Sequence, residues 1–503
     1  MKSKIPCLAI AAICSVTSFA IVPQPVSVLR NDGAFVIKPS TTISYTDEAI
    51  RPLVVYMLDY VPVKHVSKTP VEENVIAIGV DSKLQAEEYR LIVEGKRIEI
   101  AGGDYGGVFN GIQTLFQLMP SEVYTRSGRL PITVSCCQIE DRPQFAYRGF
   151  MLDVARTWMN MDKVKHYIDI LSYHKINKLH FHLTDDEGWR IEIKSHPELT
   201  QIGAYRGGSS LIDAVYGKWG ERYGGYFTQQ QLRELIDYAR VRNIEIIPEI
   251  DLPGHSRAFA RIHPEILCDN PPEFERKNNY ERRSAWCAAK ESNYGLVDDI
   301  LSEVCEIFPS KHIHVGGDEV ALSQWKNCPH CMAYMKRHGY TDAHKLEDYF
   351  MARVEKILEK YGKTPAVWNE AVNGGDLSLG TRVHGWKNVE ECIKATTKGY
   401  ETVVMPGKYF YFDMRQSPYE DGHNWAAIFD TEDCYSFDFA KSGFTEEQMK
   451  NVAGVEATFF SELYITHTPE KLDYIEYMTF PRICALSEIA WGKNGGEWDC
   501  FYD

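Results

Sequence analysis

The spacing of hydrophobic residues changes near residue 140. Before that point, segments such as "NVIAIGV" and "YRLIVEGKRIEIAG" alternate apolar and polar residues with a period of two. This pattern is typical of strands with one face in water. The stretch "YGGVFNGIQTLFQLM" instead has its apolar residues at helical spacing. We therefore predict a small α+β accessory domain over residues 21–140.

From "DRPQFAYRGF" onward, short apolar runs alternate with longer amphipathic segments. The eight runs are "RGFMLDVA", "NKLHFHL", "NIEIIPEID", "HIHVGGDE", "TPAVWNE", "RVHGW", "ETVVMP" and "VAGVEATFF". Eight strands alternating with helices are what a (β/α)₈ TIM barrel needs. The alternative, an open doubly wound sheet, normally has a glycine-rich phosphate loop after its first strand, and the sequence has none there. We predict an α/β fold with a catalytic barrel over residues 141–503.

The first twenty residues, "MKSKIPCLAIAAICSVTSFA", resemble a cleaved export signal. Lys2 and Lys4 precede an apolar run, and Ser18 and Ala20 have the spacing that a signal peptidase recognises. The run is too short for a membrane anchor. A lipid anchor on Cys14 is disfavoured, because the residue before it is a bulky isoleucine. We expect a periplasmic or extracellular protein with no membrane span.

Composition narrows the range of partners. The chain of 503 residues has a formal charge of −15 and 44% hydrophobic residues. An acidic chain without basic runs is unsuited to nucleic acid, whose binding requires basic surface. We expect a monomer or a homodimer.

The thirteen cysteines include a "CPHC" motif at Cys328 and Cys331. It could be a redox motif, half of a zinc site or a local disulfide. A local disulfide or inert thiols are favoured, because no second CxxC follows at zinc-site spacing. Cys268 and Cys287 bracket a polar segment and could pair with each other.

Polar residues gather at the C-terminal ends of the predicted strands, the end that carries the active site of a TIM barrel. A single charged residue at a strand end is usually structural, but a cluster across seven strand ends indicates a site. Its members are Asp153, His182, Asp185, Asp186, Glu249, Asp251, His255, Asp318, Glu319, Trp368, Glu370, Trp386 and Glu462.

The adjacent carboxylates Asp318 and Glu319 indicate glycoside hydrolysis. Carboxylates held together in a dry pocket repel, so at least one has a raised pKa and carries a proton that a leaving group can take. This chemistry needs carboxylates and aromatic walls but no cofactor and no metal. "HFH" at 180–182 and "HIH" at 312–314 would suit a metal-dependent hydrolase instead, although buried core histidines are commoner than ligands. A sugar-binding protein without catalysis is the third alternative.

The motifs "RGFMLDVAR", "HFHLTDDEGWRIEI", "EIDLPGHSRA", "HVGGDEV" and "WNEA" together resemble the β-N-acetylhexosaminidases of glycoside hydrolase family 20. The resemblance covers the whole predicted barrel, and the preceding segment is similar to that family's N-terminal domain. It implies a glycan substrate with a terminal N-acetylhexosamine and substrate-assisted retention, in which the 2-acetamido oxygen attacks the anomeric carbon to form an oxazolinium ion. Glu319 would be the general acid and base, and Asp318 would orient the acetamido group.

The resemblance also implies roles for further residues. Arg148 would bind the 3- and 4-hydroxyls, Asp185 and His255 would support the catalytic pair, and Tyr411 would donate to the acetamido oxygen. The remaining predicted substrate-binding residues are Trp368, Trp386, Asp413, Phe460 and Glu462, with a looser match at Trp425.

Phe460 departs from the family pattern, which usually has tryptophan at this position. The smaller ring offers less stacking area and no indole N–H, so the preference between gluco and galacto sugars is open. Release of a sulfated hexosamine or a disaccharide is an alternative within the same reaction class.

Overall fold

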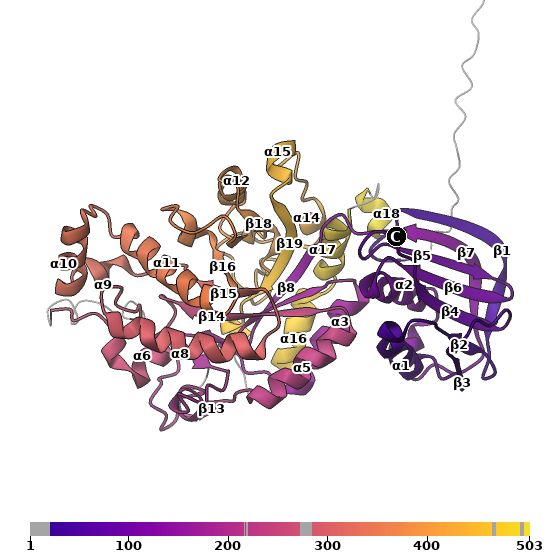
Figure 1. Cartoon of the computed structure of the whole chain (residues 1–503), viewed down its shortest axis with the longest axis horizontal. Coiled ribbons are helices and arrows are strands. Elements are labelled where there is room, and N and C mark those ends of the chain that lie inside the picture. Colours follow the sequence, from indigo (N-terminus) through magenta and orange to yellow (C-terminus); the bar gives the residue numbers. More distant parts are fainter. Residues whose placement is uncertain are drawn as a thin grey trace, which may run out of the picture.

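The computed structural model describes residues 21–215, 217, 220–271, 284–464, 469–492 and 497–502. Within this part, an open sheet and a closed barrel form two units (Figure 1). The predicted export signal, residues 1–20, lies outside the described residues and stays a prediction.

The N-terminal unit is a seven-stranded mixed sheet with the order β1-β7-β5-β6-β4-β2-β3. Its strands alternate buried and exposed residues, because one face packs on α1 (Arg51–Tyr60) and α2 (Tyr105–Gln117). The strands are β1 (Ser27–Ile37), β2 (Thr42–Ser44), β3 (His65–Ser67), β4 (Val75–Val80), β5 (Tyr89–Glu94), β6 (Arg97–Gly102) and β7 (Ile132–Asp141).

The second unit confirms the predicted (β/α)₈ barrel. Its parallel strands close in the order β14-β15-β16-β17-β18-β19-β8-β9. All eight predicted apolar runs are strands: β8 (Tyr147–Asp153), β9 (Lys178–His182), β14 (Glu245–Leu252), β15 (His312–Gly316), β16 (Thr364–Trp368), β17 (Arg382–Gly385), β18 (Glu401–Val404) and β19 (Val452–Phe459).

Amphipathic helices cover the barrel, and polar residues set where several of them begin. Asn160 caps α3 by accepting from the backbone N–H of Lys163, and Thr228 forms a capping box with Gln231 at α5. The longer helices are α3 (Met161–Tyr173), α5 (Gln229–Val241), α8 (Glu291–Ile307), α11 (His344–Lys360), α12 (Val389–Thr397), α16 (Pro469–Thr479) and α17 (Arg482–Trp491).

Shorter elements decorate the connections between strands and helices. They are β10 (Thr184–Asp185), β11 (Gly188–Trp189), α4 (Glu198–Gln201), β12 (Tyr205–Arg206), β13 (Tyr223–Gly224), α6 (Arg257–Ile262), α9 (Leu322–Lys326), α10 (Pro329–His338), α13 (Gly407–Phe410), α14 (Thr431–Tyr435), α15 (Glu446–Met449) and α18 (Trp498–Tyr502).

The two units pack together with α1 and α2 between the sheet and the barrel (Figure 1). The Tyr105 hydroxyl donates to the Val241 carbonyl at 3.0 Å, and the Gln117 amide donates to the Tyr173 carbonyl at 3.2 Å. Lys175 is fully buried and lies 3.1 Å from Asp141. The N-terminal unit is therefore attached at the N-terminal ends of β8 and β9, away from their polar C-terminal ends.

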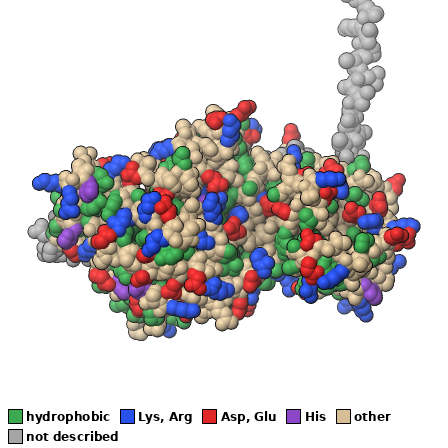
Figure 2. Space-filling view, in the orientation of Figure 1, with side chains coloured by type: hydrophobic (Ala, Val, Ile, Leu, Met, Phe, Trp, Pro, Cys, Tyr) green, Lys and Arg blue, Asp and Glu red, His purple; other side chains and the backbone are tan. Residues whose placement is uncertain are grey.

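The surface mixes both signs of charge: Figure 2 shows Lys and Arg interspersed with Asp and Glu over the visible face. Across the described residues, every helix is too short or too polar to cross a bilayer.

Candidate active site

A cavity of about 280 Å³ opens at the C-terminal ends of the barrel strands. Every predicted catalytic or substrate-binding residue except Arg148 lines it, whereas Asp153, His182, Asp186, Glu249 and Glu370 of the strand-end cluster do not. The lining residues are Arg156, Asp185, Asp251, His255, Asp318, Glu319, Trp368, Trp386, Tyr411, Asp413, His423, Trp425, Phe460 and Glu462.

The prediction that Arg148 binds substrate is wrong. Arg148 is the second residue of β8 and so lies at the opposite end of the barrel from the cavity. Its guanidinium donates to both carboxylate oxygens of Glu87 at 2.8 Å and joins the two domains. Its Nε–H also donates to the Lys175 carbonyl.

Arg156 is the arginine that lines the cavity. It follows Asp153, the last residue of β8, and its Nη2 lies 2.6 Å from Asp185 and its Nη1 3.4 Å from Asp153. Its guanidinium is 5.1 Å from the centre of the Phe460 ring. Position alone could have identified it, because it is three residues beyond the C-terminal end of a barrel strand.

The backbone after β15 turns sharply to place the two acidic residues. Gly316 and Gly317 have φ of +69° and +92°. A Cβ on Gly316 would lie 1.8 Å from Oδ1 of Asp251, and one on Gly317 would lie 2.6 Å from Cβ of Ala371. Only glycine fits both positions. Glu319 itself has φ of +46°, a conformation costly for a residue with a side chain.

His255 lies between acidic residues that follow two barrel strands, β9 and β15. Its Nε2 is 3.6 Å from Asp318 and 3.5 Å from Glu319, and its Nδ1 is 3.4 Å from Asp185. Burial lowers the pKa of His255, but the carboxylates of Asp185 and Asp318 outweigh this effect and raise it well above its usual value. His255 is therefore a cation that partly neutralises the adjacent carboxylates.

Asp318 and Glu319 have different surroundings. The Asp318 side chain is 13% exposed, and its pKa is raised to about 7. Burial is the main cause and repulsion from Glu370 adds to it, whereas the charge of His255 acts in the opposite direction. The Glu319 side chain is 60% exposed, and its hydrogen bond with His255 lowers its pKa. At neutral pH the proton of the pair therefore resides mainly on Asp318 in the free chain.

Asp185 connects His255 with a buried network of histidines and carboxylates inside the barrel. Nε2 of His182 lies 2.9 Å from Asp185, and its Nδ1 contacts Glu249. Glu249 also lies 3.0 Å from His180 and 2.9 Å from His314. His180, His182 and His314 thus lie within hydrogen-bonding distance of carboxylates, as suits buried core histidines, whereas His312 is 4.0 Å from Glu401.

Aromatic rings form one wall of the cavity. Trp386 and Tyr411 lie nearly parallel, with centroids 6.2 Å apart and planes at 15°, while Trp425 stands at 79° to Trp386. The Trp386 indole N–H donates to Glu370 at 2.8 Å, which fixes the ring. The Phe460 ring is 5.6 Å from Tyr411 and 6.4 Å from Trp368. Such faces stack against the C–H faces of sugars.

Asp413, Glu462 and His423 form the far side of the cavity. Glu462 lies 3.0 Å from His423. Burial, together with repulsion from Glu462, raises the pKa of Asp413 to about 7. Burial also acts to raise the pKa of Glu462, but the hydrogen bond with His423 and the charges of Arg156 and His423 together outweigh it and lower that pKa. Sequence reasoning missed His423, which follows no strand and carries no motif.

Several buried polar atoms of this cavity find no hydrogen-bond partner within the part of the chain that the structure describes. They are Oδ1 of Asp318, Nε1 of Trp368, Oδ1 of Asp413 and Oε2 of Glu462. An unpaired buried polar atom is costly, so the cavity suits a ligand or water rich in hydrogen-bonding groups.

Comparison with known proteins gives matches along nearly the whole chain. The model "Glycosyl hydrolase family 20, catalytic domain" matches residues 145–494, and "Glycosyl hydrolase family 20, domain 2" matches residues 18–142. A β-hexosaminidase of Porphyromonas gingivalis is 34% identical over 483 residues, covering 94% of this chain but 60% of that protein. A β-hexosaminidase of Vibrio furnissii is 33% identical, covering 93% of this chain and 76% of that protein.

Among solved structures, a GH20 exo-β-N-acetylglucosaminidase of Vibrio harveyi in complex with N-acetylglucosamine is similar, with a TM-score of 0.87 and 31% identity. The match covers 99% of this chain and 77% of that chain.

Proposed function

Because the chain belongs to glycosyl hydrolase family 20, we propose that it is an exo-acting β-N-acetylhexosaminidase that removes terminal β-linked N-acetylglucosamine or N-acetylgalactosamine from glycans. One observation carries the proposal: Asp318 and Glu319 project into a cavity walled by aromatic rings at the C-terminal end of the barrel. The names of the similar proteins support the same activity.

The aromatic end of the cavity suits one sugar ring with its acetamido arm. A second cavity of about 290 Å³ adjoins it, and both are lined by Arg156, Asp185, His255, Glu319 and Glu462. A longer part of the glycan would extend outward past Glu319, whose exposed side chain lies at the mouth.

We infer a retaining, substrate-assisted mechanism. The 2-acetamido oxygen of the bound sugar attacks the anomeric carbon while Glu319 donates a proton to the glycosidic oxygen, so the C–O bond to the leaving group breaks and an oxazolinium ion forms. Glu319, now a carboxylate, takes a proton from water, and that water attacks the anomeric carbon to reopen the ring with retention. The carboxylate of Asp318 accepts the acetamido N–H and stabilises the positive charge that develops on the nitrogen.

This mechanism requires the proton to move from Asp318 to Glu319 when substrate binds. A sugar over Glu319 removes it from water, which raises its pKa, and the acetamido N–H and developing cation beside Asp318 favour the ionised form of that residue. The free pair holds one proton near neutral pH, and substrate determines which carboxylate carries it. The active form is therefore the singly protonated pair.

The remaining cavity residues would bind the sugar. The Tyr411 hydroxyl donates to the acetamido oxygen, and Trp368, Trp386 and Phe460 pack on the ring and the acetamido methyl group. Arg156 would bind the sugar hydroxyls in place of Arg148. Asp413 and Glu462 would accept hydrogen bonds from sugar hydroxyls.

The test compares nitrophenyl β-glycosides of N-acetylglucosamine, N-acetylgalactosamine, glucosamine and glucose. The acetylated sugars should be cleaved, and the sugars without the N-acetyl group should react at least about 100-fold more slowly, because they lack the internal nucleophile. Equal cleavage of both kinds would contradict the mechanism. Binding of N-acetylglucosamine without turnover would instead indicate a carbohydrate-binding protein.

A further inference from the structure

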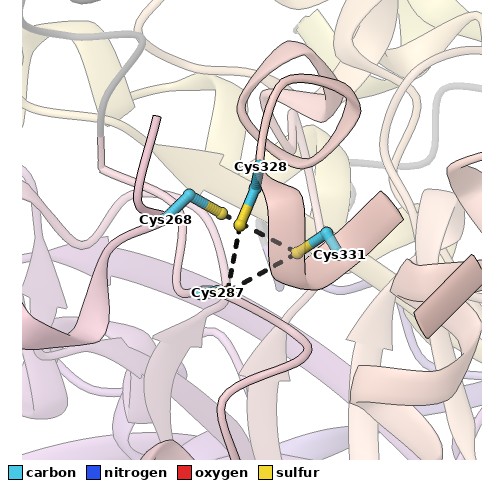
Figure 3. Close-up of side chains that lie close together, drawn as sticks. All are labelled: Cys268, Cys287, Cys328 and Cys331. Carbon is cyan, nitrogen blue, oxygen red and sulfur yellow. Dashed lines mark hydrogen bonds between the residues drawn. The ribbon is translucent and has the colours of Figure 1, made fainter. Parts of the chain in front are cut away.

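Four buried cysteines from separate stretches of the chain meet beside the barrel. Cys268 follows α6, Cys287 precedes α8, and Cys328 and Cys331 lie at the start of α10, so their sulfurs converge on one point (Figure 3). The sulfurs of Cys268 and Cys331 are 3.8 Å apart, those of Cys287 and Cys328 3.9 Å, and those of Cys287 and Cys331 3.5 Å. All four lie within 4.8 Å of one another.

These separations match the edges of a tetrahedron of thiolates around one ion. With a Zn–S distance of about 2.3 Å, the sulfurs of a tetrahedral site lie about 3.8 Å apart. A disulfide would bring two sulfurs to about 2.05 Å, and none of these four cysteines forms one. The thiolates of an iron–sulfur cluster would be spread more widely, because several irons separate them.

We propose that Cys268, Cys287, Cys328 and Cys331 bind one structural zinc ion. Four ligands fill the coordination sphere of zinc, and a closed Cys₄ site without an open position is the structural type. Cys287, Cys328 and Cys331 are fully buried and Cys268 is 7% exposed, so the ion is shielded from water. The assignment is independent of the proposed glycosidase activity.

The surroundings favour thiolates. Cys328 is the N-cap residue of the ten-residue helix α10 and Cys331 lies in its first turn, where the unpaired backbone N–H groups give a positive electrostatic potential that favours negatively charged sulfur ligands. Pro329 occupies the first helical position and fixes the turn between them. His330 is not a ligand, because it is exposed and its Nε2 lies 3.0 Å from Asp269.

The ion would join two loops at the rim of the active site. The segment around Cys287 follows β14, and the segment leading to Cys328 follows β15 and carries Glu319. The loops are already linked by hydrogen bonds from the Trp325 indole to the Trp286 carbonyl at 2.9 Å and from the Ala285 N–H to Gln324 at 3.2 Å. A zinc ion would add four Zn–S bonds to this contact between the two loops.

The first measurement is made on the full chain, purified without added metal and passed over a chelating resin. Metal analysis should give about one zinc per chain, as a closed Cys₄ site binds tightly. In a denaturant containing EDTA and iodoacetamide but no reductant, mass spectrometry should show all four cysteines alkylated. A metal-free protein with two disulfides among these cysteines would overturn the proposal, and so would stoichiometric iron.

The second measurement uses the double variant Cys328→Ser/Cys331→Ser and the matched control Cys305→Ser. Cys305 is a buried thiol of α8 outside the cluster. Zinc content should fall at least about tenfold in the double variant and stay at about one per chain in the control, because serine hydroxyls are poor zinc ligands. Full zinc content in the double variant would also overturn the proposal. If that variant fails to fold, the alkylation pattern of the unaltered chain still decides.

Discussion

The charge of His255 determines the pH range over which the singly protonated Asp318–Glu319 pair exists. Its Nε2 is 3.6 Å from Asp318, so at an effective dielectric constant near 20 the attraction is about 5 kcal/mol before screening. The same cation also attracts Glu319 and Asp185. We therefore assign roughly a third of this energy to the loss of the proton from the Asp318–Glu319 pair. That share corresponds to about one pH unit.

In the unaltered chain, kcat/KM should fall as pH rises through about 7, where the pair loses its proton. Without the His255 cation, the Asp318–Glu319 pair loses its proton less readily. In the variant His255→Gln, the fall in kcat/KM should therefore occur about one pH unit higher. The assay is a pH profile of kcat/KM with an alkyl N-acetylglucosaminide, whose poor leaving group needs the proton, and the control is His344→Gln, an exposed histidine at the start of α11. If the midpoint of this fall in the variant lies within about 0.3 pH units of its value in the unaltered chain, this electrostatic argument is refuted.

Three further substitutions test the assigned roles. Glu319→Gln should lower turnover about 100- to 10,000-fold on substrates with poor leaving groups but far less on activated ones. The measurement compares alkyl glycosides, which have poor leaving groups, with dinitrophenyl glycosides, which are activated. Asp318→Asn should reduce both by a similar factor, about 100-fold or more, and sparing of the activated substrate would contradict its orienting role. Phe460→Trp should change KM for the N-acetylglucosaminide while kcat stays within about threefold, because stacking area is uniform binding energy, and a large rise in kcat would show that the chemical step depends on this ring.

The sequence was sufficient for the barrel because each strand is buried on both sides and each helix is amphipathic. It was also sufficient for most of the cavity, since a polar residue at the C-terminal end of a barrel strand faces the site by construction. Arg148 and Arg156 show where motif matching fails. Both lie in "YRGFMLDVAR", at opposite ends of β8, and only strand direction tells which of them reaches the cavity.

Contacts that depend on tertiary structure could not be predicted. No local pattern shows that Glu249 on β14 contacts His182 and lies within 3.0 Å of His180 and His314, because the histidines come from two other strands, β9 and β15. The proximity of the four cysteines could not be predicted for the same reason. The sequence has no second CxxC at zinc-site spacing, whereas the fold brings Cys268 and Cys287 to the "CPHC" pair from distant positions.

The buried ion pairs between the two domains have a consequence for protein engineering. Arg148 is 1% exposed and relies on Glu87, which belongs to the N-terminal sheet domain, and Lys175 is fully buried against Asp141 at the end of the same domain. Truncation to the barrel alone would remove the counter-ions of both cations together with the domain that covers them. The barrel is thus not a portable module, and truncated or chimaeric proteins must carry the sheet domain with it.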